Sequence, residues 1–182
     1  MIVFESSLTR LRMFAFRNAK RPWLSLPLLM VPLQGGAVAT AQTSGPLSPF
    51  TVRVELSPAS ARTLAARHEG IVVSAAYAGE PKPSAQKHAD QMGQINLGYD
   101  RVTVAGTSGT VRVRGTGVRR PALAWVQGPV LLNVNVFTAR RSSPDNLLSC
   151  DFFDGELQHA VQSPMTLHCG LITENPKTTY FQ

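Results

Sequence analysis

Apolar and polar residues alternate in the stretch FTVRVEL, residues 50–56. Alternation with a period of two is typical of a β-strand that buries one face. The stretch IVVSAAY, residues 71–77, is more continuously apolar and predicts a strand in the interior of a sheet. Further short apolar runs predict strands at residues 94–97, 101–105, 110–114, 130–138, 150–153, 156–161 and 166–172.

Turn signals separate these runs at intervals of roughly 8–12 residues. Gly98, the GTSG stretch at residues 106–109 and Gly128-Pro129 are each expected to end one strand before the next begins. Asp154-Gly155 is the strongest hairpin signal, because both residues tolerate the positive φ of a type I′ turn. The pattern predicts an all-β fold: an antiparallel β-sandwich of about seven to nine strands, immunoglobulin-like or a similar Greek key.

One or two short helices are expected beside these strands. Ser57-Pro58 places a preferred N-cap residue before a residue favoured at the first helical position. The helix should run through residues 60–68, bury Leu64 and Ala65, and end at Gly70.

The basic charge of the chain is concentrated at its N-terminus. The whole chain has a net charge of +7. Residues 1–41 contain five Lys and Arg residues against one Glu, and residues 42–182 contain 13 against ten acidic residues, so these parts carry +4 and +3. A basic run ending at Arg21, an apolar run of 11 residues and small residues ending at Ala41 follow in order. This order is typical of a secretory signal peptide.

The sequence therefore predicts a Sec-type signal peptide over residues 1–41, with Met13 as a possible true start. The apolar run is shorter than the roughly 20 residues that a membrane helix needs, so no stable membrane insertion is expected after cleavage. We expect the mature protein to be periplasmic or secreted. Its expected parts are a flexible lead-in at residues 42–49, a single β-sandwich domain at residues 50–173 and a polar C-terminal tail at residues 174–182.

Cys150 and Cys169 are the two cysteines of the chain, and each lies on a predicted strand. An even number of cysteines behind an export signal indicates a disulfide. Neither a C-x-x-C motif nor the spacing of a zinc site surrounds them. We expect a structural disulfide, with the hairpin at Asp154-Gly155 bringing the two strands together.

A metal site is the alternative interpretation of the same region. His159, His168 and Asp151, with Asp154 and Glu156 nearby, offer imidazole and carboxylate ligands of the kind that zinc and copper accept. These residues lack a compact ligand spacing such as H-E-x-x-H, and solvent-facing positions on strands explain them equally well. No catalytic signature is present, and no cofactor other than this possible metal is expected.

A binding surface can be built from two other sets of residues. Asn133 and Asn135 share one strand face with Leu131 and Phe137, and could bind a peptide or glycan or form a hydrogen-bond ladder within the sheet. The polar stretch at residues 78–93 is a candidate binding loop. Arginines could attract an anionic partner or line a solvated face: Arg112, Arg114, Arg119, Arg120, Arg140 and Arg141.

These observations favour an exported, non-enzymatic binding or interaction module for a protein or another component of the cell envelope. Nucleic acid is disfavoured as a partner, because no aromatic residues are interleaved with the arginines and the chain carries an export signal. The alternative is a small exported metal-binding protein or hydrolase that uses His159, His168 and nearby carboxylates.

Overall fold

The structure is a computed structural model, and it describes residues 47–182. The expected signal peptide and residues 42–46 of the lead-in lie outside the described residues. The described part contains β1 (Phe50–Leu56), α1 (Pro58–Ala66), β2 (Gly70–Pro81), η1 (Pro83–His88), β3 (Ile95–Ala105), β4 (Gly109–Val113), η2 (Arg120–Trp125), β5 (Val126–Thr138), β6 (Leu148–Cys150), β7 (Phe152–Glu156), α2 (Leu157–Gln162), β8 (Met165–Leu171), η3 (Ile172–Glu174) and β9 (Tyr180–Phe181).

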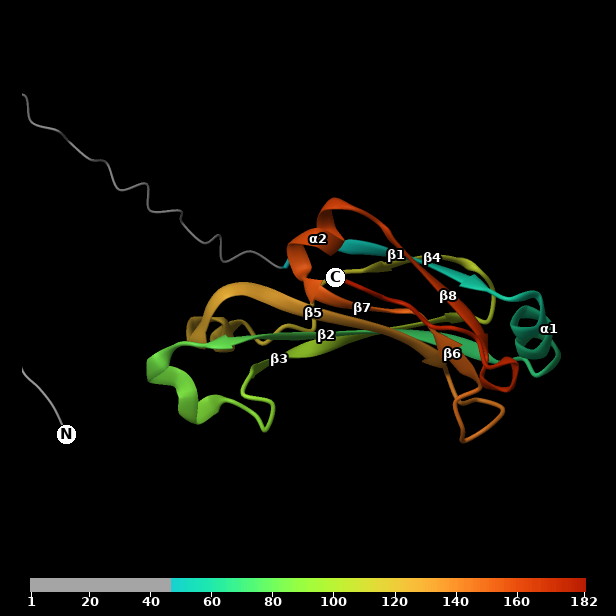
Figure 1. Cartoon of the computed structure of the whole chain (residues 1–182), viewed down its shortest axis with the longest axis horizontal. Helices are drawn as coiled ribbons and strands as arrows, with labels where there is room; N and C mark the ends of the chain where they lie inside the picture. Colours follow the sequence, from blue (N-terminus) through green and yellow to red (C-terminus); the bar gives the residue numbers. More distant parts are fainter. Residues whose placement is uncertain (1–46) are drawn as a thin grey trace, which may run out of the picture. The chain divides into compact units, whose positions relative to one another are not determined.

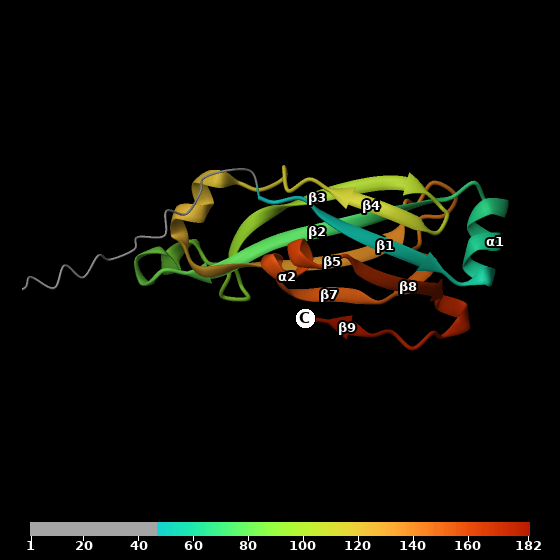
Figure 2. The same ribbon diagram turned by 90° about the horizontal axis from the view of Figure 1, so that it is seen from above.

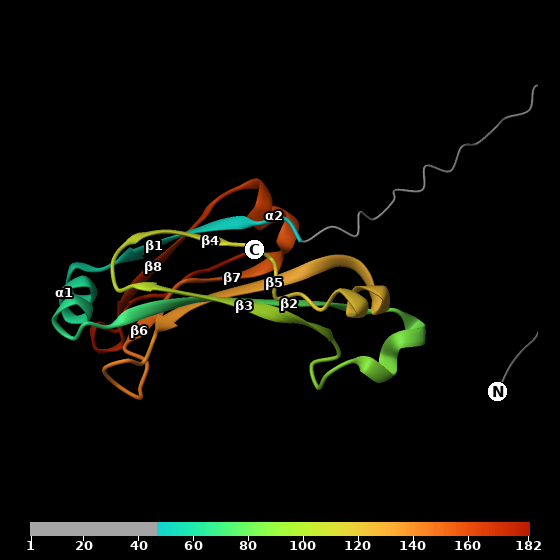
Figure 3. The ribbon, with the colours of Figure 1, turned by 180° about the vertical axis from the view of Figure 1, so that it is seen from behind.

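The strands form two mixed sheets, with the orders β4-β1-β8-β6 and β3-β2-β5-β7-β9. The sheets lie in two layers, with α1 at one end and the 3-10 helices η1 and η2 at the other (Figures 1 and 3). Strand β1 pairs with β8 in parallel, and so does β7 with β9. The expectation of purely antiparallel sheets is therefore wrong. The chain crosses through α2 from β7 in one sheet to β8 in the other, where β8 runs in the direction of β1.

The inner faces of both sheets form one hydrophobic core. Seen from above in Figure 2, β1 and β4 lie over β2 and β3. The predicted alternation is confirmed in β1, where Phe50, Val52 and Val54 are buried. The predicted interior position of β2 is also confirmed, because β3 and β5 flank it. Core residues with no exposed surface come from both sheets and include Val52, Val54, Ile71, Val73, Ala75, Leu97, Val113, Val134 and Leu167.

Two expected strand ends are instead bends within continuous strands. Gly98 lies inside β3 with a φ of +108°, and Gly128 lies inside β5 with a φ of +70°. Close to these glycines, the pairing of β2 shifts register between Tyr77 and Ala78 on the β3 side and between Ala78 and Glu80 on the β5 side. Glycine adopts a positive φ without steric cost, so each strand bends and stays in the sheet.

The expected hairpin at Asp154-Gly155 is also wrong. Both residues lie in β7, where they pair with Asn133 and Leu132 of β5. The chain then enters α2, in which Leu157 and Ala160 are buried. Buried positions three residues apart belong to one face of a helix, so the expected strand at residues 156–161 is largely helical.

Helix α1 begins as predicted and ends earlier. The Ser57 hydroxyl oxygen accepts a hydrogen bond of 3.0 Å from the Ser60 backbone N–H, and Pro58 is the first helical residue. Leu64 is buried as expected, whereas Ala65 is exposed, because consecutive helical side chains point about 100° apart. The helix ends at Ala66, and Gly70 begins β2.

The C-terminal tail is docked on the domain. Tyr180 and Phe181 pair with Phe152 and Phe153 of β7, so β9 extends the five-stranded sheet. Within residues 47–182, no helix is both long enough and apolar enough to cross a membrane.

Candidate functional site

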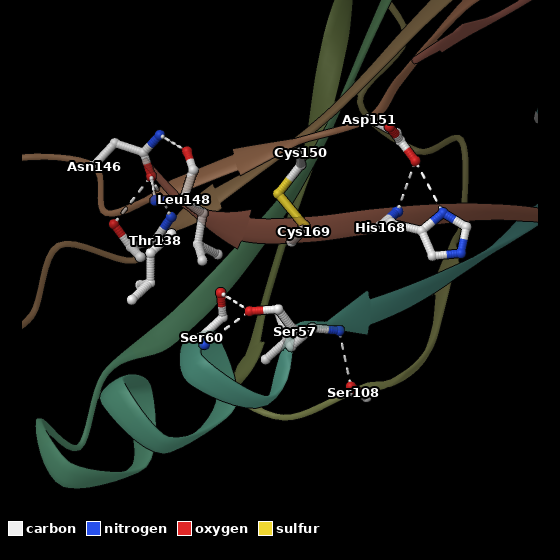
Figure 4. Close-up of a disulfide and its surroundings, with 12 residues drawn as sticks. Ser57, Ser60, Ser108, Thr138, Asn146, Leu148, Cys150, Asp151, His168 and Cys169 are labelled. Carbon is white, nitrogen blue, oxygen red and sulfur yellow. Dashed lines mark hydrogen bonds and ion pairs between the residues drawn. A yellow bond between two sulfur atoms is a disulfide. The ribbon is translucent and has the colours of Figure 1, made fainter. Parts of the chain in front are cut away.

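Cys150 and Cys169 form the predicted disulfide (Figure 4). They face each other directly across β6 and β8, with their Cα atoms 4.0 Å apart. No hairpin joins these two strands, because β7 and α2 lie between them in the chain. The disulfide therefore links the two ends of the segment that contains β7 of the other sheet and α2.

Asp151 and His168 also come together, beside the disulfide (Figure 4). One oxygen of the Asp151 carboxylate accepts a hydrogen bond of 3.1 Å from the His168 backbone N–H and lies 3.0 Å from Nδ1 of its ring. The other oxygen accepts a hydrogen bond of 2.6 Å from the Thr179 N–H. Burial raises the pKa of Asp151, but these hydrogen bonds outweigh it, so the pKa lies below its usual value.

The outer nitrogen of the His168 ring meets a second carboxylate. Nε2 lies 3.3 Å from Oε2 of Glu55, whose other oxygen accepts a hydrogen bond of 2.8 Å from Nε of Arg53. His168 thus lies between two carboxylates, and its side chain is 64% exposed. This arrangement ties β1, β8 and the C-terminal segment together.

His159 does not join this cluster. It is exposed on α2, and it borders the same surface cavity of about 560 Å³ as His168, together with Phe181 of the C-terminal strand. Within residues 47–182 there is no group of three or more His, Cys, Asp and Glu residues placed to hold a metal ion. The metal hypothesis for His159, His168 and Asp151 stays a prediction.

The candidate arginines lie in separate parts of the domain. Arg112 is exposed on β4, an edge of the four-stranded sheet, and Arg114 is exposed directly after it. Arg140 and Arg141 follow the end of β5 in the other sheet. The two pairs therefore come from different sheets, and their combination into one binding surface stays a prediction.

A buried carboxylate fixes the loop that contains Arg140 and Arg141. Glu69 is 4% exposed, and its carboxylate accepts hydrogen bonds from the N–H groups of Gly70, Arg141 and Ser142 and from the Ser142 hydroxyl. Burial raises the pKa of Glu69, but these four hydrogen bonds together lower it to about 2. All four hydrogen bonds to the Glu69 carboxylate come from within the fold, so we assign this residue a structural role.

Asn133 and Asn135 share one strand face, as predicted, and that face is the outer one of the five-stranded sheet. The Asn135 side-chain N–H donates a hydrogen bond to the side-chain oxygen of Asn133. Across the strands, Asn133 is level with Ala76 of β2 and Asp154 of β7, and Ala76 is level with Tyr99 of β3. These residues form a row across the outer face of the sheet.

This row belongs to a groove of about 600 Å³ on the outer face, which we call the outer groove. Ala76 and Ala78 of β2 lie between bulkier residues of β3 and β5 and form its floor. Met92, which is 83% exposed, lies in the segment between η1 and β3 that borders the groove. Part of the predicted binding loop therefore borders the same groove as Asn133.

Sequence reasoning missed Tyr99 and Asp154 as groove residues, and it included Met92 only as part of the candidate loop at residues 78–93. Tyr99 is 57% exposed, and the Arg101 guanidinium carbon lies 4.9 Å from the centre of its ring. Asp154 is exposed on β7. The signal for Asp154 was present, but its position before a glycine was interpreted as a turn.

Comparisons with protein-family models, curated proteins and solved structures found no match for this chain.

Proposed function

We propose that this protein is an exported, non-enzymatic binding module that holds a protein or another component of the cell envelope in the outer groove. The observation that carries this proposal is the makeup of that groove. Exposed Tyr99 and Met92 border a floor of alanines, and the amide of Asn133 lies beside the exposed carboxylate of Asp154. A concave site with apolar walls and a few convergent polar groups is the usual form of a binding site.

Export is supported by the predicted leader and by the disulfide, since disulfides persist in oxidising compartments. The two-layer arrangement supports a β-sandwich, and an immunoglobulin-like or Greek-key relationship of its strands stays a prediction. Nucleic acid remains the disfavoured partner. The outer groove contains carboxylates and no described Lys, Arg or His, which does not suit a polyanion.

The test is site-specific photo-crosslinking in cells that export the full chain. In one variant a photoreactive amino acid replaces Met92, at the border of the outer groove. In the matched control it replaces Ile172, which lies on η3 and is 52% exposed. The proposal predicts an adduct in the envelope fraction at position 92 and none at position 172. The absence of an adduct at position 92, or equal adducts at both positions, would overturn it. Mass spectrometry of the same exported protein checks that it begins at Gln42.

The second candidate, a small metal-binding protein or hydrolase, is favoured by the His168 arrangement alone. Asp151 orients the ring through Nδ1, and Nε2 faces Glu55, so one imidazole nitrogen and one carboxylate meet at the surface. Titration of the purified protein with ZnCl₂ or CuSO₄ by calorimetry tests it. The candidate predicts binding that His168→Gln abolishes and His159→Gln weakens, and no measurable binding would exclude it.

A further inference from the structure

We propose that the ligand of the outer groove is a neutral oligosaccharide, bound across the strands of the five-stranded sheet. This inference rests on the proposed function, and it specifies the chemistry of the ligand. Three features of the groove support it: a flat aromatic wall beside a small-residue floor, an adjacent donor and acceptor, and the sign of its charge.

The first feature is the row of residues from Tyr99 to Asp154. It crosses four neighbouring strands, about 14 Å at 4.8 Å per strand. Ala76 lies between Tyr99 and Asn133 in this row, so no long side chain fills the middle of the groove. A sugar ring resting on Ala76 would meet Tyr99 on one side. The Arg101 guanidinium carbon lies over the Tyr99 ring, 4.9 Å from its centre, so a sugar would contact the other face of the tyrosine ring.

The second feature is the cross-strand pair of Asn133 and Asp154. The side-chain oxygen of Asn133 accepts a hydrogen bond from Asn135, so its N–H₂ group is the donor that this side chain offers to a ligand. The Asp154 carboxylate can only accept hydrogen bonds. One donor beside one acceptor matches two neighbouring hydroxyl groups of a sugar, one of which accepts from Asn133 while the other donates to Asp154.

The third feature is the charge of the groove. Asp90 and Asp154 line it, and no Lys, Arg or His is among the described residues that line it. Arg101, which lies against the Tyr99 ring, is a cation beside the groove that does not line it. Sulfated, phosphorylated or uronic acid chains would place negative charge against these carboxylates. A neutral chain avoids this repulsion.

The position of the floor disfavours an extended peptide. Strands β2 and β5 are both interior strands, so their backbone N–H and C=O groups are used within the sheet. A peptide on this face could not add as a further strand, which is how extended peptides usually bind to sheets. Its backbone would depend on the few side-chain partners in the groove.

A second aromatic pair continues the outer face beyond Asp154. Phe152 lies two residues before Asp154 on β7 and is stacked on Tyr180 of β9, with ring centres 5.9 Å apart. Tyr180 is 59% exposed. We therefore expect longer oligosaccharides to reach this pair, and Tyr180→Ala to weaken the binding of long chains more than that of short ones.

The experiment uses the purified exported protein on an array of neutral gluco-, manno-, galacto- and N-acetylglucosamine oligosaccharides, with heparin and polygalacturonate as anionic comparators. Calorimetry then measures the strongest neutral binder. Tyr99→Ala should weaken binding at least tenfold through loss of stacking. Asp154→Asn should weaken it about fivefold, because a charge-assisted hydrogen bond becomes a neutral one. Thr103→Ala alters an exposed residue of β3 away from the groove, so it should bind like the wild type.

The outcomes distinguish the ligand class inferred here from the proposed function of the outer groove. Neutral binding that is lost in Tyr99→Ala and Asp154→Asn supports the inference. If only anionic chains bind, or if no oligosaccharide binds while the crosslink at position 92 persists, the ligand class is wrong and the proposed function stands. Neutral binding that both variants leave unchanged overturns the assignment to this groove. Loss of both oligosaccharide binding and the crosslink contradicts the proposed function as well.

Discussion

Replacement of Glu69 by Gln should remove a large part of the stability of the domain at neutral pH. The pKa of Glu69 falls from 4.5 to about 2 in the fold, because four hydrogen bonds outweigh the effect of burial. One pKa unit corresponds to about 1.4 kcal/mol, so this shift corresponds to about 3 kcal/mol. Relaxation of the loop at residues 140–142 would reduce the loss, so we expect about 2 kcal/mol.

The sign of the pH dependence follows from the lowered pKa. The unfolded chain binds a proton at Glu69 more readily than the folded protein does, so the contribution is complete above pH 4.5. It is lost as the pH falls towards 2. The glutamine side chain of the variant cannot ionise, so the variant should lose less stability between pH 5 and pH 3 than the wild type.

Urea unfolding of the purified protein at pH 7, 5 and 3 measures both effects. Glu80→Gln is the matched control, because Glu80 is an exposed residue of β2. Its unfolding free energy should stay within about 0.5 kcal/mol of the wild type. The reasoning is refuted if Glu69→Gln matches the wild type at pH 7 and shows the same dependence on pH.

Three further predictions concern the contacts around the disulfide. The double variant Cys150→Ala, Cys169→Ala should unfold at lower urea concentration, with a loss of about 3 kcal/mol for a separation of 19 residues, and an unchanged midpoint would contradict this. Asp151→Asn should speed hydrogen exchange at the Thr179 amide about tenfold at pH 7 and leave β2 protected, whereas unchanged exchange would show that the carboxylate does not hold the tail. Asn146→Ala should cost about 1–3 kcal/mol in urea unfolding, because the side chain joins the backbones of Thr138 and Leu148, and a change below about 0.5 kcal/mol would count against that role.

Features set by local spacing could be predicted from the sequence. The period-two pattern located β1 and β4, the apolar run at residues 71–77 located β2, and Ser57-Pro58 located the start of α1. These signals depend on neighbouring residues alone. The cysteine pair was also predictable, since two cysteines allow one intramolecular pairing.

Features set by distant partners could not be predicted. A turn can form at Gly98, Gly128 or Asp154-Gly155, but these residues do not force the chain to turn. Pairing with neighbouring strands keeps all of them within strands. Glu69 receives two of its hydrogen bonds from Ser142, 73 residues away, which no local pattern reveals.

The outer groove shows the same limit for the candidate site. Asn133 and Asn135 were found because they alternate with apolar residues on one strand. Tyr99 and Asp154 belong to the groove only because β3 and β7 lie two strands and one strand away from β5. A single sequence does not contain that strand order.

The most direct test of the account is a nitrogen-15 NMR titration of the purified exported protein with a soluble extract of the cell envelope. We predict that the signals that shift come from the outer groove, including the backbone amides of Tyr99, Met92 and Asp154 and the side-chain amide of Asn133. Shifts confined to Arg112 and Arg114 on one side, or to His168 on the other, would contradict a binding site on the outer face. No shift at any concentration would contradict a binding function in the envelope.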